Sequence, residues 1–346
     1  MNPKQFTSDK ILNHLDEVNE WYKEGNPFAI TLEIDLTNKC NHNCPGCVGG
    51  DLSLKEELSK NEINKTIKEV SEMGCKGIIF TGGGEPLCHP YAGEAIKYAK
   101  SKNMDVGLIT NGGLLHNFNN ESLLSNCTWI RISLDAGSER IHRIVHGTKD
   151  FSKVVEDIKT LVDTKKRIQS DCTIGVGYLT GVGTNNFNDM MDFVNLSIEL
   201  EVDYAQFRPF IKPLNKKDLT DFTPIDFNQF LSKANETTNI LCSKHKYDAM
   251  INNNIKRQYD KCYGHQFATT ISASGEMYIC CHGRGIQSMV IGDIKKNSIK
   301  EIWNSEQRKK AVSEIKLKEC PLLCRADTFN TILWNIKKEK NHINFL

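Results

Sequence analysis

The sequence has no long apolar run and no charge of one dominant sign. No stretch approaches the roughly 18 apolar residues of a membrane span, and residues 1–6 contain no apolar segment typical of a secretion signal. The 44 basic and 43 acidic residues leave a net charge of +1, which argues against the basic surface of a protein that binds nucleic acid or an anionic membrane. We therefore expect a cytoplasmic protein with no nucleic-acid partner and no membrane partner.

Cysteine, by contrast, is abundant, with 13 residues among 346. An odd, clustered set of cysteines without a secretion signal favours metal binding in a reducing compartment over a disulfide framework. The rest of the composition, 39% hydrophobic and 25% charged, is that of an ordinary globular protein. The length allows about two domains.

The most informative stretch is a CxxxCxxC loop formed by Cys40, Cys44 and Cys47, which directly follows the strand-like residues 30–36. Thiolates are soft metal ligands, and a zinc site or a complete iron–sulfur cluster normally takes four protein ligands. Three cysteines on one loop therefore leave one metal position open for chemistry. A zinc loop with a distant fourth ligand and a disulfide-rich segment are the alternatives at this point.

Strand-like and helix-like segments alternate from residue 30 to about residue 210. Strands are predicted at 30–36, 77–81, 106–110, 129–134, 173–179 and 204–210, and helices at 60–73, 91–102, 121–125, 152–166 and 188–200. Strict alternation predicts an α/β fold with a parallel sheet and right-handed crossovers. An amphipathic helix, with apolar residues recurring at helical spacing between residues 11 and 22, precedes the first strand as a lid or cap.

Polar or glycine-rich segments follow the predicted strands, where active sites of strand-helix barrels collect. Consecutive glycines let a backbone approach a ligand closely, and the carboxylate that follows suits a zwitterionic ligand. The candidate residues are Gly82, Gly83, Gly84 and Glu85 after the second strand, Asn111 after the third, Ser133 and Asp135 after the fourth, and Arg208 in the sixth. The agreement among these positions predicts one site at this end of the sheet.

A CxxxCxxC loop after the first strand, followed one unit later by a glycine motif, resembles the radical S-adenosylmethionine (SAM) enzymes. The resemblance implies a partial (β/α)6 TIM-like barrel, with Cys40, Cys44 and Cys47 holding a [4Fe–4S] cluster whose fourth iron is chelated by SAM. The family's GGE motif is matched by Gly83, Gly84 and Glu85, with Gly82 as an extra residue ahead of it.

The same resemblance gives roles to the other candidate residues. Asn111, Ser133 and Asp135 match positions that contact the SAM ribose or carboxylate, although a turn at Asn111 and a helix cap at Ser133 or Asp135 are equally open. Arg208 meets the SAM carboxylate, meets an anionic substrate, or forms a structural ion pair.

A second cysteine cluster consists of Cys262, Cys280, Cys320 and Cys324. A hairpin is predicted from 269–273 and 276–280 with its turn at 274–275, then a helix at 299–315 and a terminal helix. This pattern resembles the C-terminal α+β extension called SPASM, in its shortened twitch form, because the CxxCxxxxxC run of a full SPASM domain is absent. The resemblance implies one auxiliary [4Fe–4S] cluster, and a four-cysteine zinc site is the competing interpretation.

Cys281 adjoins Cys280 and should point to the opposite face of its strand. Either cysteine is a candidate ligand, with the Gly-x4-Cys register favouring Cys280. A free Cys281 is a candidate hydrogen-atom donor or a buried thiol. Together these features predict a helical cap at residues 1–29, a radical SAM core at 30–210, a linker and helix at 211–258, and an auxiliary cluster domain at 259–346. Within the linker segment, an exposed connection is predicted at 211–225 and a polar helix at 226–241.

The resemblance also implies a reaction. A low-potential donor of the flavodoxin or ferredoxin type delivers an electron, SAM is cleaved reductively, and the 5′-deoxyadenosyl radical takes a hydrogen atom from a substrate. The auxiliary cluster then accepts an electron, as in an oxidoreductase; epimerisation and elimination stay open.

The substrate is the least determined part of this interpretation. The segment before the first strand is too short for a leader-peptide recognition domain, and the full SPASM cysteine set is missing. Both features favour a small polar metabolite, such as a sugar or aminocyclitol. A maturase or epimerase of a ribosomally made peptide is the alternative, and a non-catalytic iron–sulfur or zinc scaffold is the alternative from another class.

Overall fold

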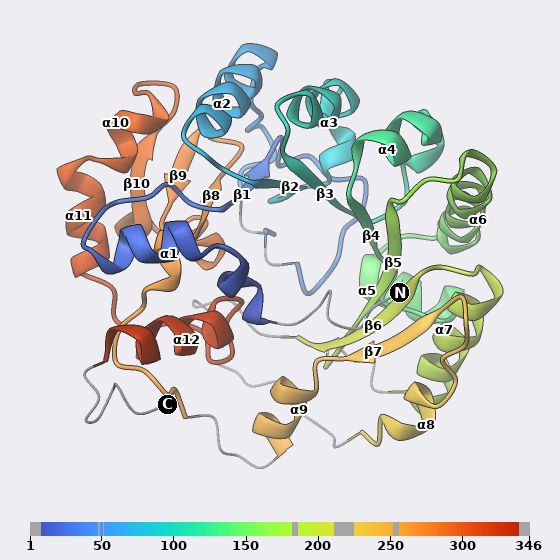
Figure 1. Cartoon of the computed structure of the whole chain (residues 1–346). Coiled ribbons are helices and arrows are strands. Elements are labelled where there is room, and N and C mark those ends of the chain that lie inside the picture. The colour runs from blue at the N-terminus through green and yellow to red at the C-terminus, as the bar shows by residue number, and fades with distance from the viewer. Residues whose placement is uncertain are drawn as a thin grey trace.

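The computed structural model describes residues 8–47, 49–50, 52–181, 186–210, 225–251 and 256–338. Ten strands form one sheet in the order β10-β9-β8-β1-β2-β3-β4-β5-β6-β7. The strands from β8 to β7 are parallel, and only the β8–β9 and β9–β10 pairs are antiparallel. Figure 1 shows these strands curving into an open barrel with the helices outside it, so the predicted α/β partial barrel is confirmed.

The six predicted barrel strands are all present. They are β1 (Thr31–Asp35), β2 (Gly77–Thr81), β3 (Asp105–Thr110), β4 (Trp129–Ser133), β5 (Thr173–Thr180) and β6 (Tyr204–Pro209). Side chains alternate between the two faces of each strand. In β1, Leu32 and Ile34 are fully buried in the main hydrophobic core, whereas the intervening Glu33 and Asp35 face the other way, into the barrel.

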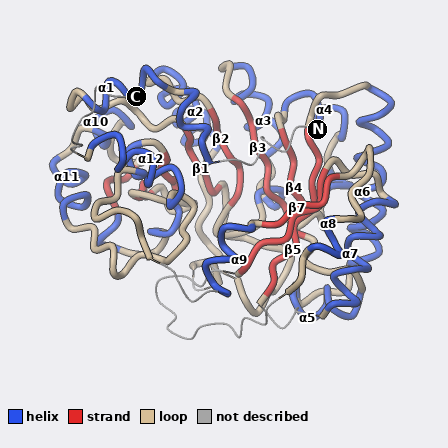
Figure 2. The backbone as a smooth tube through the Cα atoms, turned by 60° about the horizontal axis from the view of Figure 1, so that its bottom comes forward, coloured by secondary structure: helices blue, strands red, loops and turns tan. Residues whose placement is uncertain are grey.

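Helices cover the outer face of the sheet, as the tube in Figure 2 also shows. They are α2 (Lys60–Glu72), α3 (Ala92–Ser101), α4 (Asn120–Asn126), α6 (Phe151–Ile168) and α7 (Phe187–Glu199). A sixth helix, α5 (Glu139–His146), lies beyond the end of β4 and contacts the cysteine loop, where the Asn43 N–H donates to the His146 carbonyl at 3.0 Å. Five of the six lie where the sequence pattern predicts a helix. The exception, α5, begins where the Ser138 hydroxyl accepts the Ile141 N–H (3.4 Å) and ends at Gly147 in the left-handed region (φ 65°).

The segment after β6 differs from the prediction. Residues 211–224, predicted as a connection, lie outside the described ranges. The helix predicted at 226–241 is wrong: α8 (Asn228–Leu231) is one turn long and is followed by β7 (Asn239–Cys242), which pairs with β6, and by α9 (Lys244–Ile251). Helix propagation stops because the Asn235 side chain accepts the N–H groups of Thr237 and Thr238 at 3.0 and 2.7 Å, an Asx turn.

The C-terminal part continues the barrel sheet. The predicted hairpin is confirmed as β8 (Ala268–Ile271) and β9 (Glu276–Tyr278), turning at Gly275 (φ 95°), with β10 (Val290–Asp293) beside β9. The helix predicted at 299–315 is two helices, α10 (Ile299–Trp303) and α11 (Glu306–Ser313), because Ser305 caps a new helix by accepting the Arg308 N–H (3.1 Å). The last described helix is α12 (Asp327–Lys337).

The N-terminal segment packs against this C-terminal part. A short 3₁₀ helix (Ser8–Asn13) precedes α1 (Leu15–Tyr22). Their apolar residues form a small core of their own with Phe267 and with Leu333 of α12, and Figure 1 shows α1 beside α12. Among the described helices, none combines the length and the apolar content that crossing a membrane requires.

Candidate functional site

The three cysteines of the CxxxCxxC loop gather where β1 ends. Burial, together with the neighbouring Cys47 and Cys40 thiols, raises the pKa of Cys44 to about 12. All 13 cysteines are free, which excludes the disulfide interpretation. Each thiolate makes it harder for its neighbours to lose their protons. A bound metal cation removes this repulsion, and the thiols then release their protons and act as ligands. The arrangement therefore fits a metal cluster.

The glycine loop after β2 packs directly onto the start of the cysteine loop. A Cβ atom on Gly84 would lie 2.3 Å from the Lys39 carbonyl oxygen, and one on Gly83 would lie 2.3 Å from Asn38 Oδ1. The Glu85 N–H donates to the same Lys39 carbonyl at 2.9 Å. Only glycine fits this contact, so the two loops form one rigid edge.

The Glu85 side chain is buried and makes hydrogen bonds within the protein. Its carboxylate accepts hydrogen bonds from the Leu87 N–H (3.1 Å), the Thr110 hydroxyl (2.7 Å) and the Asn111 N–H (2.7 Å). Burial raises its pKa to about 7 in spite of these bonds, which favour the charged form. Glu85 thus ties the loop after β2 to the loop after β3, and its predicted part in SAM binding rests on its backbone.

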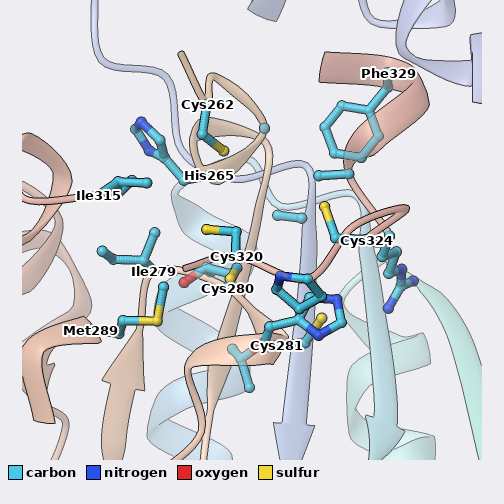
Figure 3. Close-up of a pocket in the computed structure, with 18 of the residues that line it drawn as sticks. Cys262, His265, Ile279, Cys280, Cys281, Met289, Ile315, Cys320, Cys324 and Phe329 are labelled. Carbon is cyan, nitrogen blue, oxygen red and sulfur yellow. The ribbon is translucent and has the colours of Figure 1, made fainter. Parts of the chain in front are cut away.

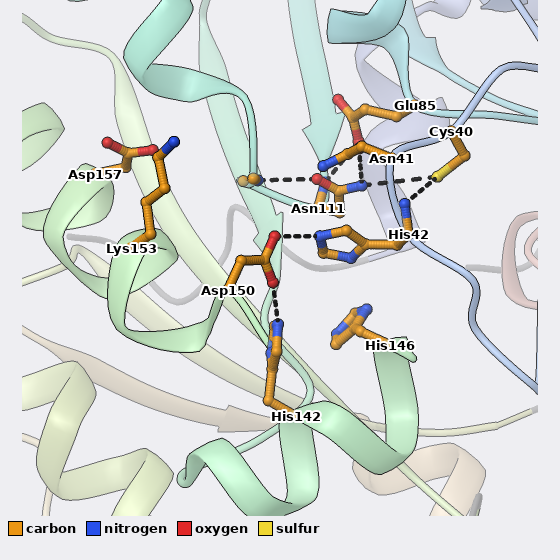
Figure 4. Close-up of polar contacts among 12 residues, drawn as sticks. Cys40, Asn41, His42, Glu85, Asn111, His142, His146, Asp150, Lys153 and Asp157 are labelled. Atoms are coloured by element: carbon orange, nitrogen blue, oxygen red, sulfur yellow. Dashed lines mark hydrogen bonds and ion pairs between the residues drawn. The ribbon is translucent and has the colours of Figure 1, made fainter. Parts of the chain in front are cut away.

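Asn111 lies beside the cysteine loop. Its Nδ2 donates to Asn41 Oδ1 at 2.8 Å and approaches Cys40 Sγ at 3.7 Å, as Figure 4 shows. Its Oδ1 accepts the Gly113 N–H (2.9 Å), so the turn interpretation also holds. The residue therefore both shapes a turn and contacts a predicted cluster ligand.

Ser133 and Asp135 do not cap a helix, because the cap of α5 is Ser138. The Ser133 backbone pairs with β5, and its hydroxyl makes no hydrogen bond to the residues that the structure describes. Asp135 adopts a left-handed conformation (φ 51°), and its Oδ1 accepts the Leu179 N–H at 2.7 Å. Burial raises the pKa of Asp135, although Arg208 and Arg131 oppose the rise.

A buried cluster of histidines under the cysteine loop is absent from the sequence prediction. Asp150 bridges His42 Nε2 (2.9 Å) and His142 Nε2 (3.0 Å), and His146 Nδ1 lies 3.4 Å from Cys44 Sγ. Figure 4 shows the rings converging. Burial lowers the pKa of His146 to about 3, helped by His142 and His42, so this ring is neutral.

The histidine cluster fixes the loop to α5. His42 is buried, and its ring is bonded to Asp150, 108 positions further along the chain. The Nε2, Nε2 and carboxylate atoms of His42, His142 and Asp150 lie within 4.8 Å of one another, so they could also hold a metal ion. The available signal was the i, i+4 spacing of His142 and His146 on one helix face.

The second cysteine cluster lines one cavity, shown in Figure 3. Cys262, Cys280, Cys281, Cys320 and Cys324 are all on its wall. Burial raises the pKa of Cys262 to about 11 and that of Cys280 to about 12. These thiols fit a cluster because a bound cation would relieve the unfavourable proximity of four thiolates.

Cys280 and Cys281 differ in their neighbours. The pKa of Cys280 is raised by burial and then by Cys262, Cys324 and Cys320. The pKa of Cys281 is raised to about 12 by burial and then by Cys280, with Arg284 opposing it. Because β9 ends at Tyr278, Cys281 begins a 3₁₀ turn (Cys281–Gly283), so its predicted place in the strand is wrong.

Two comparisons of sequence agree with this geometry. Residues 34–194 match the Radical SAM superfamily, and residues 262–326 match the iron-sulfur cluster-binding domain SPASM. A probable GTP 3′,8-cyclase of Methanocaldococcus jannaschii is 27% identical over 223 residues, which are 63% of this chain and 72% of that protein. An AdoMet-dependent heme synthase of Methanosarcina barkeri is 26% identical over 299 residues, 79% of this chain and 81% of that protein.

Solved structures show the same fold. Streptococcus suis SuiB bound to precursor peptide SuiA aligns with a TM-score of 0.68 at 13% identity, covering 90% of this chain and 72% of that one. The protein anSMEcpe with bound AdoMet aligns with a TM-score of 0.58 at 18% identity, covering 90% of this chain and 92% of that one.

Proposed function

Because this chain belongs to the radical SAM superfamily and carries a SPASM iron-sulfur domain, we propose that it oxidises a small polar substrate by hydrogen-atom abstraction. Its cofactors are SAM, a [4Fe–4S] cluster and an auxiliary [4Fe–4S] cluster. When bound, they supply the reducing electron and the 5′-deoxyadenosyl radical. The observation that carries the proposal is the meeting of three free thiols with the glycine loop at one edge of the barrel.

The chain's own residues position and shield the chemistry. Cys40, Cys44 and Cys47 would hold the cluster, and the loop tied down by Glu85 would present backbone groups to the methionine end of SAM. Asn111 and the unpaired hydroxyl of Ser133 would contact its polar groups. With SAM and substrate bound, the barrel wall would help to exclude water from the site and so protect a reactive radical.

The auxiliary site supports oxidation. Cys262, Cys280, Cys320 and Cys324 all line the cavity, and as a four-cysteine ligand set they would leave no iron of the cluster open to a substrate. Such a site is suited to accept an electron from a substrate radical. A reductant of the flavodoxin or ferredoxin type would supply the electron that starts the reaction.

The relatives of similar length support a small-molecule substrate. The two named above are described by their action on GTP and by heme synthesis, and both align over more than two thirds of their own length. The peptide-bound SuiB structure shares the fold at 13% identity. We propose a sugar or aminocyclitol as the first substrate class. Identification of a peptide substrate would replace this proposal by the peptide-modifying alternative.

The first experiment is anaerobic reconstitution with iron and sulfide, followed by reduction with dithionite and addition of SAM. We expect about eight irons per chain, as two [4Fe–4S] clusters require, and formation of 5′-deoxyadenosine. A variant with Cys40, Cys44 and Cys47 all changed to Ala should keep about four irons and form none. Binding of zinc in place of iron, or the absence of SAM cleavage, would contradict the enzymatic proposal and favour the non-catalytic scaffold.

The type of reaction is tested with the substrate. Deuterium transferred from a labelled metabolite pool into 5′-deoxyadenosine identifies the substrate fraction, and a peptide in that fraction would contradict the small-molecule proposal. A product two hydrogens lighter supports oxidation. A product that has the substrate's mass in ordinary water, and that gains one deuterium when formed in heavy water, would instead support epimerisation.

A further inference from the structure

Two arginines lie on the inner face of the barrel: Arg208, for which the sequence left three roles open, and Arg131, to which it gave none. On β4, Ile130 and Ile132 are fully buried in the outer core, so Arg131 between them faces the interior. On β6, Phe207 packs against Phe193 of α7, so Arg208 faces inward as well. The strands place two cations inside one barrel.

The two side chains converge over Gly177 of β5. A Cβ atom on Gly177 would lie 3.3 Å from Arg208 Nη2 and 4.0 Å from Arg131 Cδ. Gly175, the preceding inward position, likewise leaves space that the Tyr204 ring fills. Inward glycines on β5 therefore clear the space into which both guanidinium groups extend.

Neither arginine forms a direct ion pair with the residues that the structure describes, although the Asp135 carboxylate attracts both from a greater distance. Within those residues no carboxylate oxygen lies within 4.0 Å of Arg131 or Arg208, and the Nε of each is buried without a hydrogen-bond partner. Arg284, by contrast, is paired with Asp35 and Glu33 on the opposite side of the barrel. The carboxylates of Glu33 and Asp35 on β1 thus have a direct cationic partner, whereas the two arginines on β4 and β6 have no direct anionic partner among the described residues.

The nearest acid is already in use. Asp135 accepts the Leu179 N–H and lies 3.7 Å from His146 Nε2. The pKa of Arg208 is lowered to about 9, first by burial and then by Arg131, which shows that the two cations oppose each other. Burying two like charges together is unfavourable unless an anion joins them.

We propose that Arg131 and Arg208 bind an acidic group of the substrate, a carboxylate or a phosphate, inside the barrel. The inference rests on the proposed function and narrows its substrate to an anionic molecule. Arg131 precedes Ser133 by two residues on the same face, so it lies about 7 Å deeper in the barrel than the end of β4. Because SAM would bind at the cysteine loop, its carboxylate would lie too far from Arg131. An anion held by Arg131 would therefore belong to the substrate.

The test measures equilibrium binding of two probe anions, inorganic phosphate and succinate, and separately of SAM, to the reconstituted protein by calorimetry. Arg131→Met and Arg208→Met should each weaken the preferred anion by about tenfold or more, the loss of one charge-assisted pair. Arg167→Met removes an exposed arginine paired with Glu121 and is the matched control for net charge. The better of the two probes identifies the acidic group.

A variant that keeps both charges guards against misfolding. Gly177→Val fills the space between the guanidinium groups and should weaken anion binding by a similar factor while circular dichroism and iron content stay unchanged. Equal anion affinity in all variants, no binding of either anion by the wild type, or loss of SAM affinity alone in Arg131→Met would each overturn the inference. Because anion binding needs no turnover, failure of SAM cleavage would count against the proposed function only.

Discussion

Arg284 of the C-terminal domain holds Asp35 of β1 with two hydrogen bonds, Nε to Oδ2 at 2.7 Å and Nη2 to Oδ1 at 2.9 Å. The Asp35 side chain is fully buried, and the two residues are 249 positions apart. Arg284 Nη1 also donates to the Cys281 carbonyl oxygen at 3.0 Å. One arginine therefore links the barrel interior to the wall of the auxiliary cysteine cavity.

Replacing Arg284 by Met should cost about 3–5 kcal/mol of unfolding free energy, because a buried carboxylate loses its partner. Urea unfolding of the reconstituted protein measures this loss. Lys309→Met breaks an exposed pair with Glu306 on α11 and should cost less than about 1 kcal/mol. Equal stability of the two variants would show that Arg284 does not hold the domains together.

Cys280 and Cys281 should differ in iron content. Cys280→Ala removes the thiol that faces Cys262, Cys320 and Cys324, and should lower iron from about eight to about four per chain. Cys281→Ala is the matched variant and should keep the full complement. Iron analysis and electron paramagnetic resonance of the reduced protein measure the cluster content of each variant. Loss of iron in Cys281→Ala but not in Cys280→Ala would identify Cys281 as the ligand.

The loss of stability on replacing Glu85 should depend on how many hydrogen-bond acceptor oxygens the new side chain keeps. Glu85→Ala strands the N–H groups of Leu87 and Asn111 and should cost about 3 kcal/mol, whereas Glu85→Gln keeps one acceptor oxygen and should cost less. Urea unfolding gives the ranking. An alanine variant as stable as the wild type would mean that this tie is dispensable.

Local pattern was sufficient for the barrel strands because each is a short segment that either alternates, as Leu32 and Ile34 do around Glu33, or is a buried apolar run, as in β2. It failed at β7, since the Asx turn of Asn235 has no periodicity to announce it. The CxxxCxxC loop was recognisable because its three cysteines lie within eight residues of sequence.

The other functional contacts join residues far apart in the chain. His42 meets Asp150, 108 residues away, and Arg284 meets Asp35 only because β8 joins the barrel sheet at β1. Arg131 looked like an ordinary polar residue of a strand. Its role depends on the glycines of β5, which sequence pattern alone does not place opposite it.

The protein should lose stability as the pH falls below about 6.5, the ordinary value of histidine. Burial lowers the pKa of His265 to about 3, with Arg308 adding to the effect, so the folded state keeps this ring neutral. The unfolded state gains a proton on acidification and the folded state does not. Stability is therefore fully present above pH 6.5 and declines as the pH falls toward 3.

Between pH 7.5 and 5.5, His265 alone should account for about 1.3 kcal/mol of the decline in unfolding free energy. Urea unfolding at the two pH values measures it, and His265→Phe should reduce the difference by that amount. His146 and His282, whose pKa values burial lowers to about 3 and about 4, account for further loss in both proteins. An unchanged difference in His265→Phe would mean that this ring takes up its proton in the folded state, and that its surroundings are more polar than the cavity wall indicates.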